Sequence, residues 1–153
     1  MTQMLSTLYE SDFSQWLDQT IELLKEKKFS ELDLGNLIEE IESLGKSQRS
    51  AIASYLTVLL THLLKWKYQS SERQYTAEGT PKGSWAGSIR YSRIEISQLL
   101  KDNPSLKQYL PTALEDCYRK SVIVAKTETG LDIFPHECPF LLKDMLDEQW
   151  LPD

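Results

Sequence analysis

Apolar residues recur at a spacing close to 3.6 residues along almost the whole chain, and stretches of strict apolar and polar alternation are missing. This spacing is typical of amphipathic α-helices. A chain of 153 residues is also long enough to bury roughly two thirds of its unfolded surface without covalent cross-links. We therefore expect an all-α protein: a single domain over residues 1–153, formed by a bundle of five or six helices with an irregular C-terminal tail.

Capping residues predict where the first helices begin and end. Asp12 is expected to cap a first helix that frays near Lys27. Its buried stripe is predicted to comprise Phe13, Trp16, Leu17, Thr20, Ile21 and Leu24. Asp33 opens a second helix that Gly45 ends or bends, and residues 46–66 are expected to form the core helix of the bundle.

The second half of the chain is divided by glycine and proline. Residues 69–84 have no apolar period and are expected to form a long, flexible loop. Ser84 is expected to cap a fourth helix, and Pro104 to start a short one. A last long helix should end at Gly130 in the left-handed conformation, and residues 150–152 should pack back onto the bundle.

Charge is distributed unevenly along the chain, whose net charge is −6. Residues 1–45 carry ten acidic and three basic side chains, a net charge of −7, whereas residues 46–120 carry twelve basic and six acidic ones, a net charge of +6. Such asymmetry indicates either an anionic partner or helices that neutralise one another within one domain. We favour the second interpretation, because runs of charge are usually solvated helix faces.

A polar junction is expected where the second, third and fourth helices meet. The junction is formed by three pairs of polar residues. The two members of each pair are three residues apart, so they share a face of their helix. The junction comprises Glu39, Glu42, His62, Lys65, Arg90 and Arg93. If the helices form an up-and-down bundle, the acidic and basic pairs can neutralise one another, and a ligand is expected beside them, next to residues 69–84.

An enzyme or a metal-binding bundle using Glu39, Glu42 and His62 is a weaker alternative. Carboxylate di-metal bundles use a Glu-x-x-His pair on each of two helices, and the sequence has no such pair. It also has no serine elbow and no glycine-rich phosphate loop, and Cys117 lies on a predicted buried face. We therefore expect no catalytic residue, no metal and no cofactor.

A basic and aromatic strip between residues 65 and 93 predicts weak nucleic-acid binding as a second interpretation. Such residues suit phosphate pairing and base stacking. The strip comprises Lys65, Trp66, Lys67, Arg73, Lys82, Trp85, Arg90 and Arg93. Alternatively, the two tryptophans are core residues, and the basic groups neutralise the charge of the acidic helices. A net charge of −6 also opposes binding of a polyanion.

The cellular location is expected to be the cytoplasm. The first residues lack a basic leader with a long apolar run, and the longest apolar segment, residues 55–64, is too short to span a membrane. Two cysteines, Cys117 and Cys138, cannot form a disulfide framework, so reduced thiols are expected.

Several short motifs in series resemble one known family, the domain of unknown function 29, which is common in cyanobacteria. They are Leu32-Asp33-Leu34, Glu39-Glu40-Ile41-Glu42-Ser43-Leu44-Gly45, His62-Leu63-Leu64-Lys65-Trp66, Ser84-Trp85, Pro104-Ser105-Leu106 and Phe134-Pro135. The resemblance extends from about Tyr9 to Pro152. It implies a compact, helical, bacterial and cytoplasmic protein, and it supplies no catalytic residue.

The sequence therefore favours a non-enzymatic helical interaction module without membrane contact. Its partner is expected to be an unknown protein or a second copy of the chain, because apolar helical surfaces and acidic faces are what such modules use.

Overall fold

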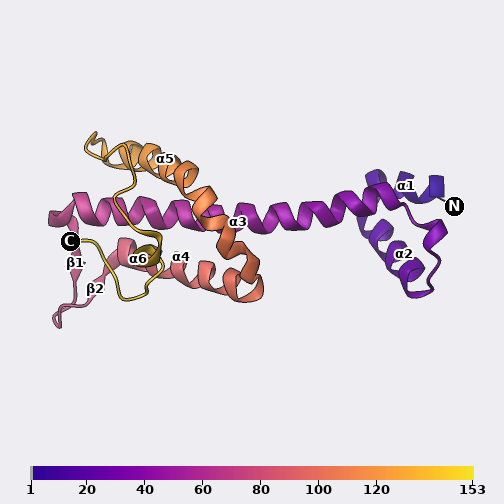
Figure 1. The fold of residues 1–153 in the computed structure, drawn as a ribbon, viewed down its shortest axis with the longest axis horizontal. Coiled ribbons are helices and arrows are strands. Elements are labelled where there is room, and N and C mark those ends of the chain that lie inside the picture. The colour runs from indigo at the N-terminus through magenta and orange to yellow at the C-terminus, as the bar shows by residue number, and fades with distance from the viewer. Residues whose placement is uncertain (1) are drawn as a thin grey trace. The chain divides into compact units, whose positions relative to one another are not determined.

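The computed structural model describes residues 2–153, which are almost entirely helical (Figure 1). The α-helices are α1 (Thr2–Ser11), α2 (Phe13–Lys25), α3 (Leu34–Tyr68), α4 (Gly83–Asp102), α5 (Tyr109–Thr129) and α6 (Leu142–Met145). Short 3-10 helices occupy Phe29–Glu31, Ser70–Glu72 and Pro104–Gln108, and the strands are β1 (Gln74–Tyr75) and β2 (Pro81–Lys82). The predicted all-α class is confirmed.

The chain divides into two compact units, which we call unit one (Met1–Ser47) and unit two (Gln48–Asp153). Helix α3 contributes residues to both. The expectation that residues 1–153 form one domain stays a prediction, and each unit is described by itself.

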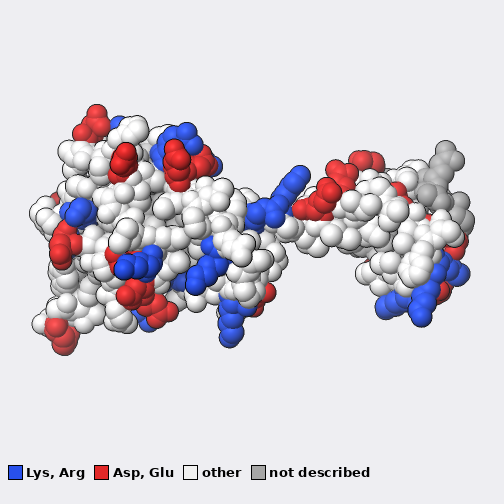
Figure 2. All heavy atoms as spheres, viewed as in Figure 1, with Lys and Arg blue, Asp and Glu red and all other residues white. Residues whose placement is uncertain are grey.

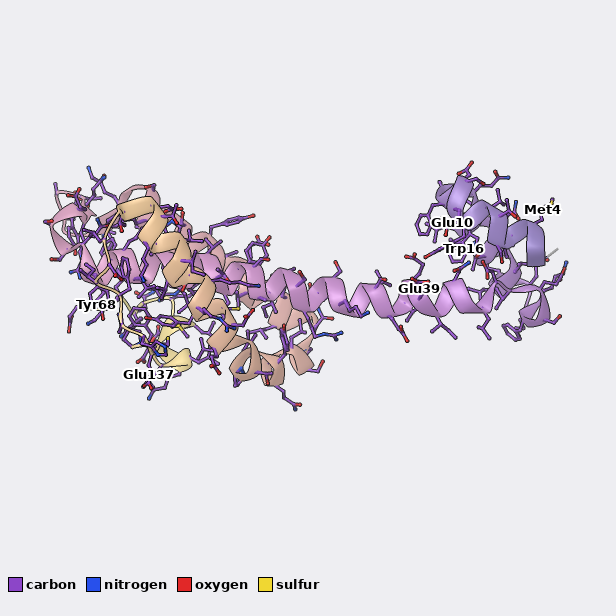
Figure 3. All side chains as sticks on the ribbon, turned by 90° about the horizontal axis from the view of Figure 1, so that it is seen from above. Met4, Glu10, Trp16, Glu39, Tyr68 and Glu137 are labelled. Carbon is purple, nitrogen blue, oxygen red and sulfur yellow. The ribbon has the colours of Figure 1, made fainter. Side chains whose placement is uncertain are left out.

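Unit one is organised around Trp16, which is fully buried. Its ring packs edge-on against Tyr9 of α1, with 5.0 Å between the ring centroids, and its Nε1 donates a hydrogen bond to Oδ2 of Asp33 at 3.1 Å. The Tyr9 hydroxyl donates in turn to Oε1 of Glu40 on α3 at 2.6 Å. Figure 3 shows Trp16 between α1 and the start of α3. Residues far apart in the sequence thus meet around one ring.

The predicted start of α2 is confirmed, whereas its predicted buried face is wrong. The Asp12 side chain accepts a hydrogen bond from the Gln15 backbone at 3.1 Å, as expected of a cap. Of the six residues in the predicted stripe, only Trp16 and Thr20 are buried. The other four are Phe13, Leu17, Ile21 and Leu24, which are 38–45% exposed. The reason is that the buried contacts of α2 within unit one are concentrated on the side that carries Trp16.

The expectation that a helix ends at Gly45 is wrong, because residues 34–68 form one helix, whereas a bend at Gly45 stays a prediction. Gly45 is helical, and its φ is not positive. A single glycine within a helix costs only about 1 kcal/mol relative to alanine, and no proline follows in this helix to stop it. The second and third predicted helices are therefore consecutive parts of α3.

Unit two is built on the second half of α3, with α4 and α5 on either side of it in Figure 1. As predicted, this segment is the core helix. Its fully buried apolar side chains are Ile52, Leu56, Leu59, Leu60, Leu63 and Leu64. They pack against Ile89 and Ile96 of α4, Leu110 and Tyr118 of α5, and Met145 of α6.

The segments that connect and follow these helices match the predictions in part. The expected loop at 69–84 contains the antiparallel β1–β2 hairpin, and α4 begins at Gly83, one residue before the predicted cap. The last long helix ends at Gly130 with φ 72°, as predicted. Trp150 and Leu151 pack against the core of unit two, so the expected return of the tail is confirmed.

Substitution of Gly45 tests the continuity of α3, and substitution of Gly130, at the end of α5, provides the comparison. Because Gly45 lies inside a helix, Gly45→Ala should raise the free energy of unfolding by about 1 kcal/mol. Gly130→Ala should lower it by about 1 kcal/mol, because alanine is strained in the left-handed region. Thermal unfolding followed by far-ultraviolet circular dichroism measures both. Destabilisation by Gly45→Ala would show that this residue is a helix terminus, as Gly130 is.

Candidate functional site

Unit one exposes most of its large apolar side chains. Among its described residues, the only large ones that are buried are Leu5, Trp16 and Leu32. Ten others are 38–67% exposed, and we call them the apolar surface of unit one: Met4, Phe13, Leu17, Ile21, Leu24, Phe29, Leu34, Ile38, Ile41 and Leu44. Monomeric proteins rarely expose contiguous apolar patches of more than a few hundred Å². The apolar surface of unit one is therefore a candidate interaction site.

The exposed residues form stripes along the helices. On α3, Leu34, Ile38 and Ile41 are spaced by four and three residues, so they share one face. On α2, Leu17, Ile21 and Leu24 follow the same rule. Unit two differs in proportion, because eighteen of its apolar residues are buried in one core and nine large ones are exposed. What distinguishes unit one is that its exposed large apolar side chains outnumber its buried ones.

Carboxylates lie beside both stripes. Asp18 and Glu22 follow Leu17 and Ile21 on α2, and Glu39 and Glu42 follow Ile38 and Ile41 on α3; all four acidic residues are exposed. Figure 2 shows acidic side chains gathered along the first half of α3, and basic ones at the turn that follows α2. Unit one contains ten acidic and four basic residues, a net charge of −6. The whole net charge of the chain therefore belongs to this unit.

A hollow of about 280 Å³ is present in unit one. Its apolar lining comes from Leu5 and Leu23, and its carboxylates come from Asp18, Glu22 and Glu31. This combination of apolar walls and acidic groups suits a long side chain that has an apolar stem and a positive head.

The predicted polar junction required its acidic pair and its histidine–lysine pair to lie on two helices that face each other, and this arrangement is wrong. Glu39 and Glu42 belong to unit one, whereas His62 and Lys65 lie further along the same helix in unit two. Because the turn expected at Gly45 is absent, these residues are not on facing helices. Binding of a ligand by any of them stays a prediction.

Lys65 and Arg93 are buried, and each has a partner that the sequence did not reveal. The Lys65 ammonium donates a hydrogen bond to Glu128 of α5 within an ion pair, and burial lowers the pKa of Lys65. Arg93, which is 5% exposed, donates through Nε to the Met145 carbonyl and through Nη2 to the Trp150 carbonyl, both at 2.7 Å. Arg93 therefore fastens the C-terminal segment to α4.

Arg90 differs from Arg93 in its surroundings. It is exposed and makes no hydrogen bond or ion pair with the described residues. Both arginines line a hollow of about 230 Å³, together with Thr80 and Pro81 from the connection between α3 and α4. A ligand site beside these arginines and next to residues 69–84 was expected, and occupation of the hollow stays a prediction.

His62 is half-buried, and its Nδ1 donates to the Val58 carbonyl of the preceding turn at 2.8 Å. Burial lowers the pKa of His62, and the charge of Lys65 lowers it further, while the bond to Val58 opposes the shift. Among the described residues, no group of three or more histidine, cysteine or acidic side chains could hold a metal ion.

The basic and aromatic strip does not form one continuous surface. Trp66 is 2% exposed, and Lys65 and Arg93 are also in the interior. Arg73 stacks over the Trp66 ring, 5.4 Å from its centroid, and donates through Nε to the Trp66 carbonyl at 2.6 Å. Lys67, Lys82, Trp85 and Arg90 are at least partly exposed. Four of the eight residues are thus used within the fold.

The comparisons with known proteins identify a family. The family model described as "Domain of unknown function DUF29" matches residues 8–151. The chain belongs to this family. The DUF29 match includes residues of both units, and the family's function is unknown. No curated protein and no solved structure matches the chain. No helix among residues 2–153 is long and apolar enough to cross a membrane.

Substitution of Arg93 should destabilise the protein, whereas the same change at Arg90 should not. Arg93→Met keeps an apolar stem but removes two charge-assisted hydrogen bonds, so we expect a loss of about 3 kcal/mol in the free energy of unfolding. Arg90→Met should stay within about 0.5 kcal/mol of the wild type. Urea unfolding measures both, and equal effects of the two variants would contradict the assigned role of Arg93.

The lowered pKa of His62 predicts a pH dependence of stability. Protonation is more difficult in the folded state than in the unfolded state. The contribution of His62 is therefore fully present above the ordinary pKa of 6.5 and is lost as the pH falls from there through the lower pKa of the folded state. In His62→Gln, the loss of stability between about pH 7.5 and pH 5.5 should be smaller than in the wild type. Thermal unfolding at several pH values measures this, and identical slopes would contradict it.

Proposed function

We propose that this DUF29 protein is a helical interaction module that binds a helix of a second, different protein through the apolar surface of unit one. The observation that carries the proposal is the burial pattern of this unit, in which three large apolar side chains are buried and ten are exposed. Covering this surface would remove apolar area from water at roughly 25 cal/mol per Å². A partner is thus expected to stabilise unit one as well as bind to it.

The spacing of the exposed residues supports a helical partner. Leu34, Ile38 and Ile41 repeat at helical intervals on α3, and Leu17 and Ile21 do so on α2. Amphipathic helices bind to such surfaces through residues spaced by three and four positions. The partner should therefore present an apolar stripe of its own.

The charge of unit one opposes a second copy of the chain as the occupant. Two copies would each bring a net charge of −6 to a shared interface. Like charges placed opposite one another at an interface disfavour association. A different protein avoids this repulsion.

Nucleic-acid binding and catalysis are not favoured as functions. The acidic unit repels a polyanion, and four residues of the basic strip are used in packing, hydrogen bonds or an ion pair. For the cell, we propose a cytoplasmic location and a cyanobacterial source. The unpaired thiols of Cys117 and Cys138 fit a reducing compartment, and family resemblance supports the source.

A matched pair of double variants tests the proposal. The first variant combines Ile38→Ala with Ile41→Ala on α3, where the two side chains are 48% and 59% exposed. The control combines Ile123→Ala with Val124→Ala on α5, where they are 60% and 38% exposed. The probe is a synthetic amphipathic helix with a leucine stripe and glutamine elsewhere, and fluorescence anisotropy measures its affinity. The α3 variant should bind at least about tenfold more weakly than the wild type, since tenfold corresponds to 1.4 kcal/mol. The α5 variant should bind as the wild type does.

The proposal fails if the probe does not bind, or if both variants bind equally well. Sedimentation of the protein alone provides a further test. A concentration-dependent dimer that is lost in the α3 variant would replace the proposed partner by a second copy of the chain.

A further inference from the structure

We propose that the partner helix carries basic residues along the edge of its apolar stripe, and that Asp18, Glu22, Glu39 and Glu42 select it by their charge. This inference rests on the proposed function and adds the chemistry of the partner. Its support is the arrangement of these four carboxylates relative to the apolar surface of unit one.

The same two-residue pattern is repeated on both helices. Leu17-Asp18 and Ile21-Glu22 lie on α2, and Ile38-Glu39 and Ile41-Glu42 lie on α3. Successive residues of a helix are about 100° apart around its axis. Each carboxylate therefore lies on the same side of its apolar neighbour. The edge of the α3 stripe is acidic, and that of the α2 stripe is acidic until Lys25, which follows Leu24.

These four carboxylates are not neutralised within the described structure. All are exposed, and none accepts a side-chain hydrogen bond or forms an ion pair with residues 2–153. Three other acidic groups of unit one have side-chain partners. Asp33 accepts from Trp16 and Asn36, Glu40 accepts from Tyr9, and Glu26 pairs with Lys28. The four carboxylates beside the stripes are thus available to a partner, as are Glu10 and Glu31.

The hollow of about 280 Å³ adds a position for one basic side chain. Leu5 and Leu23 can contact an apolar stem, while Asp18, Glu22 and Glu31 can pair with the charged head. Asp18 and Glu22 therefore border both the stripe of α2 and this hollow. A lysine or arginine at the edge of the partner's stripe fits both features.

Each exposed ion pair contributes little by itself. The four carboxylates of unit one act together on an approaching partner, because they attract a basic helix before contact and so raise the association rate. Selection by these groups should therefore weaken as salt screens them. The apolar contacts should persist at high salt.

Three synthetic helices with an identical leucine stripe test this inference on the full chain. Their flanking positions carry lysine, glutamine or glutamate, and fluorescence anisotropy measures their affinities at low and at high salt. The lysine helix should bind at least tenfold more tightly than the glutamate helix at low salt. The glutamine helix should lie between them, and the three affinities should converge at high salt.

A quadruple variant assigns the selection to the four carboxylates. It combines Asp18→Asn, Glu22→Gln, Glu39→Gln and Glu42→Gln. The matched control changes four exposed acidic residues of unit two to the same extent, by Glu78→Gln, Glu115→Gln, Glu137→Gln and Asp153→Asn. The first variant should lose the preference for lysine while binding the glutamine helix as before, and the control should retain the preference.

The outcomes separate this inference from the proposed function. If none of the three helices binds, the proposed function fails, and the inference fails with it. If all bind with similar affinity, or if the preference for lysine survives the quadruple variant, the inference is overturned while the proposed function stands. Loss of the preference in the control variant would likewise overturn it, because net charge rather than this surface would be responsible.

Discussion

The burial of the second half of α3 is the constraint on which unit two depends. From Ile52 to Leu64, six apolar side chains are completely buried, and they occupy too much of the helix circumference for one neighbour to cover. Helices α4 and α5 and the C-terminal segment together provide that cover. Polar groups of α3 and α4 are taken inside as well. Lys65 of α3 therefore pairs with Glu128, and Arg93 of α4 with the carbonyls of the C-terminal segment.

Unit one shows the opposite relation between sequence and burial. Its helices have apolar stripes like those of unit two, but its contacts are concentrated around Trp16 and leave most of these stripes exposed. A unit of this size is only marginally stable even with a complete core. The same deficit that weakens unit one provides the surface for the proposed partner, so stability and binding are linked through the same side chains.

Local signals in the sequence predicted several helix ends and the core helix correctly. The Asp12 cap, the left-handed Gly130 and the core helix in residues 46–66 follow from interactions within a few residues or from a strong period, and the structure confirms them. The break at Gly45 failed, because a single glycine lowers helix propensity only slightly and one continuous helix forms. The two helices expected to face each other in the polar junction were therefore parts of the same helix.

The sequence by itself determined the helical class, most helix termini, the acidic character of the first segment and the family resemblance. Only the tertiary structure decided which stripes are covered, which charges are paired and where Arg93 binds. The physical reason is that periodicity is local and shows which residues share a face, whereas burial depends on elements that are distant in the sequence. Leu17 and Leu56 both lie on regular stripes, yet one is 38% exposed and the other is completely buried.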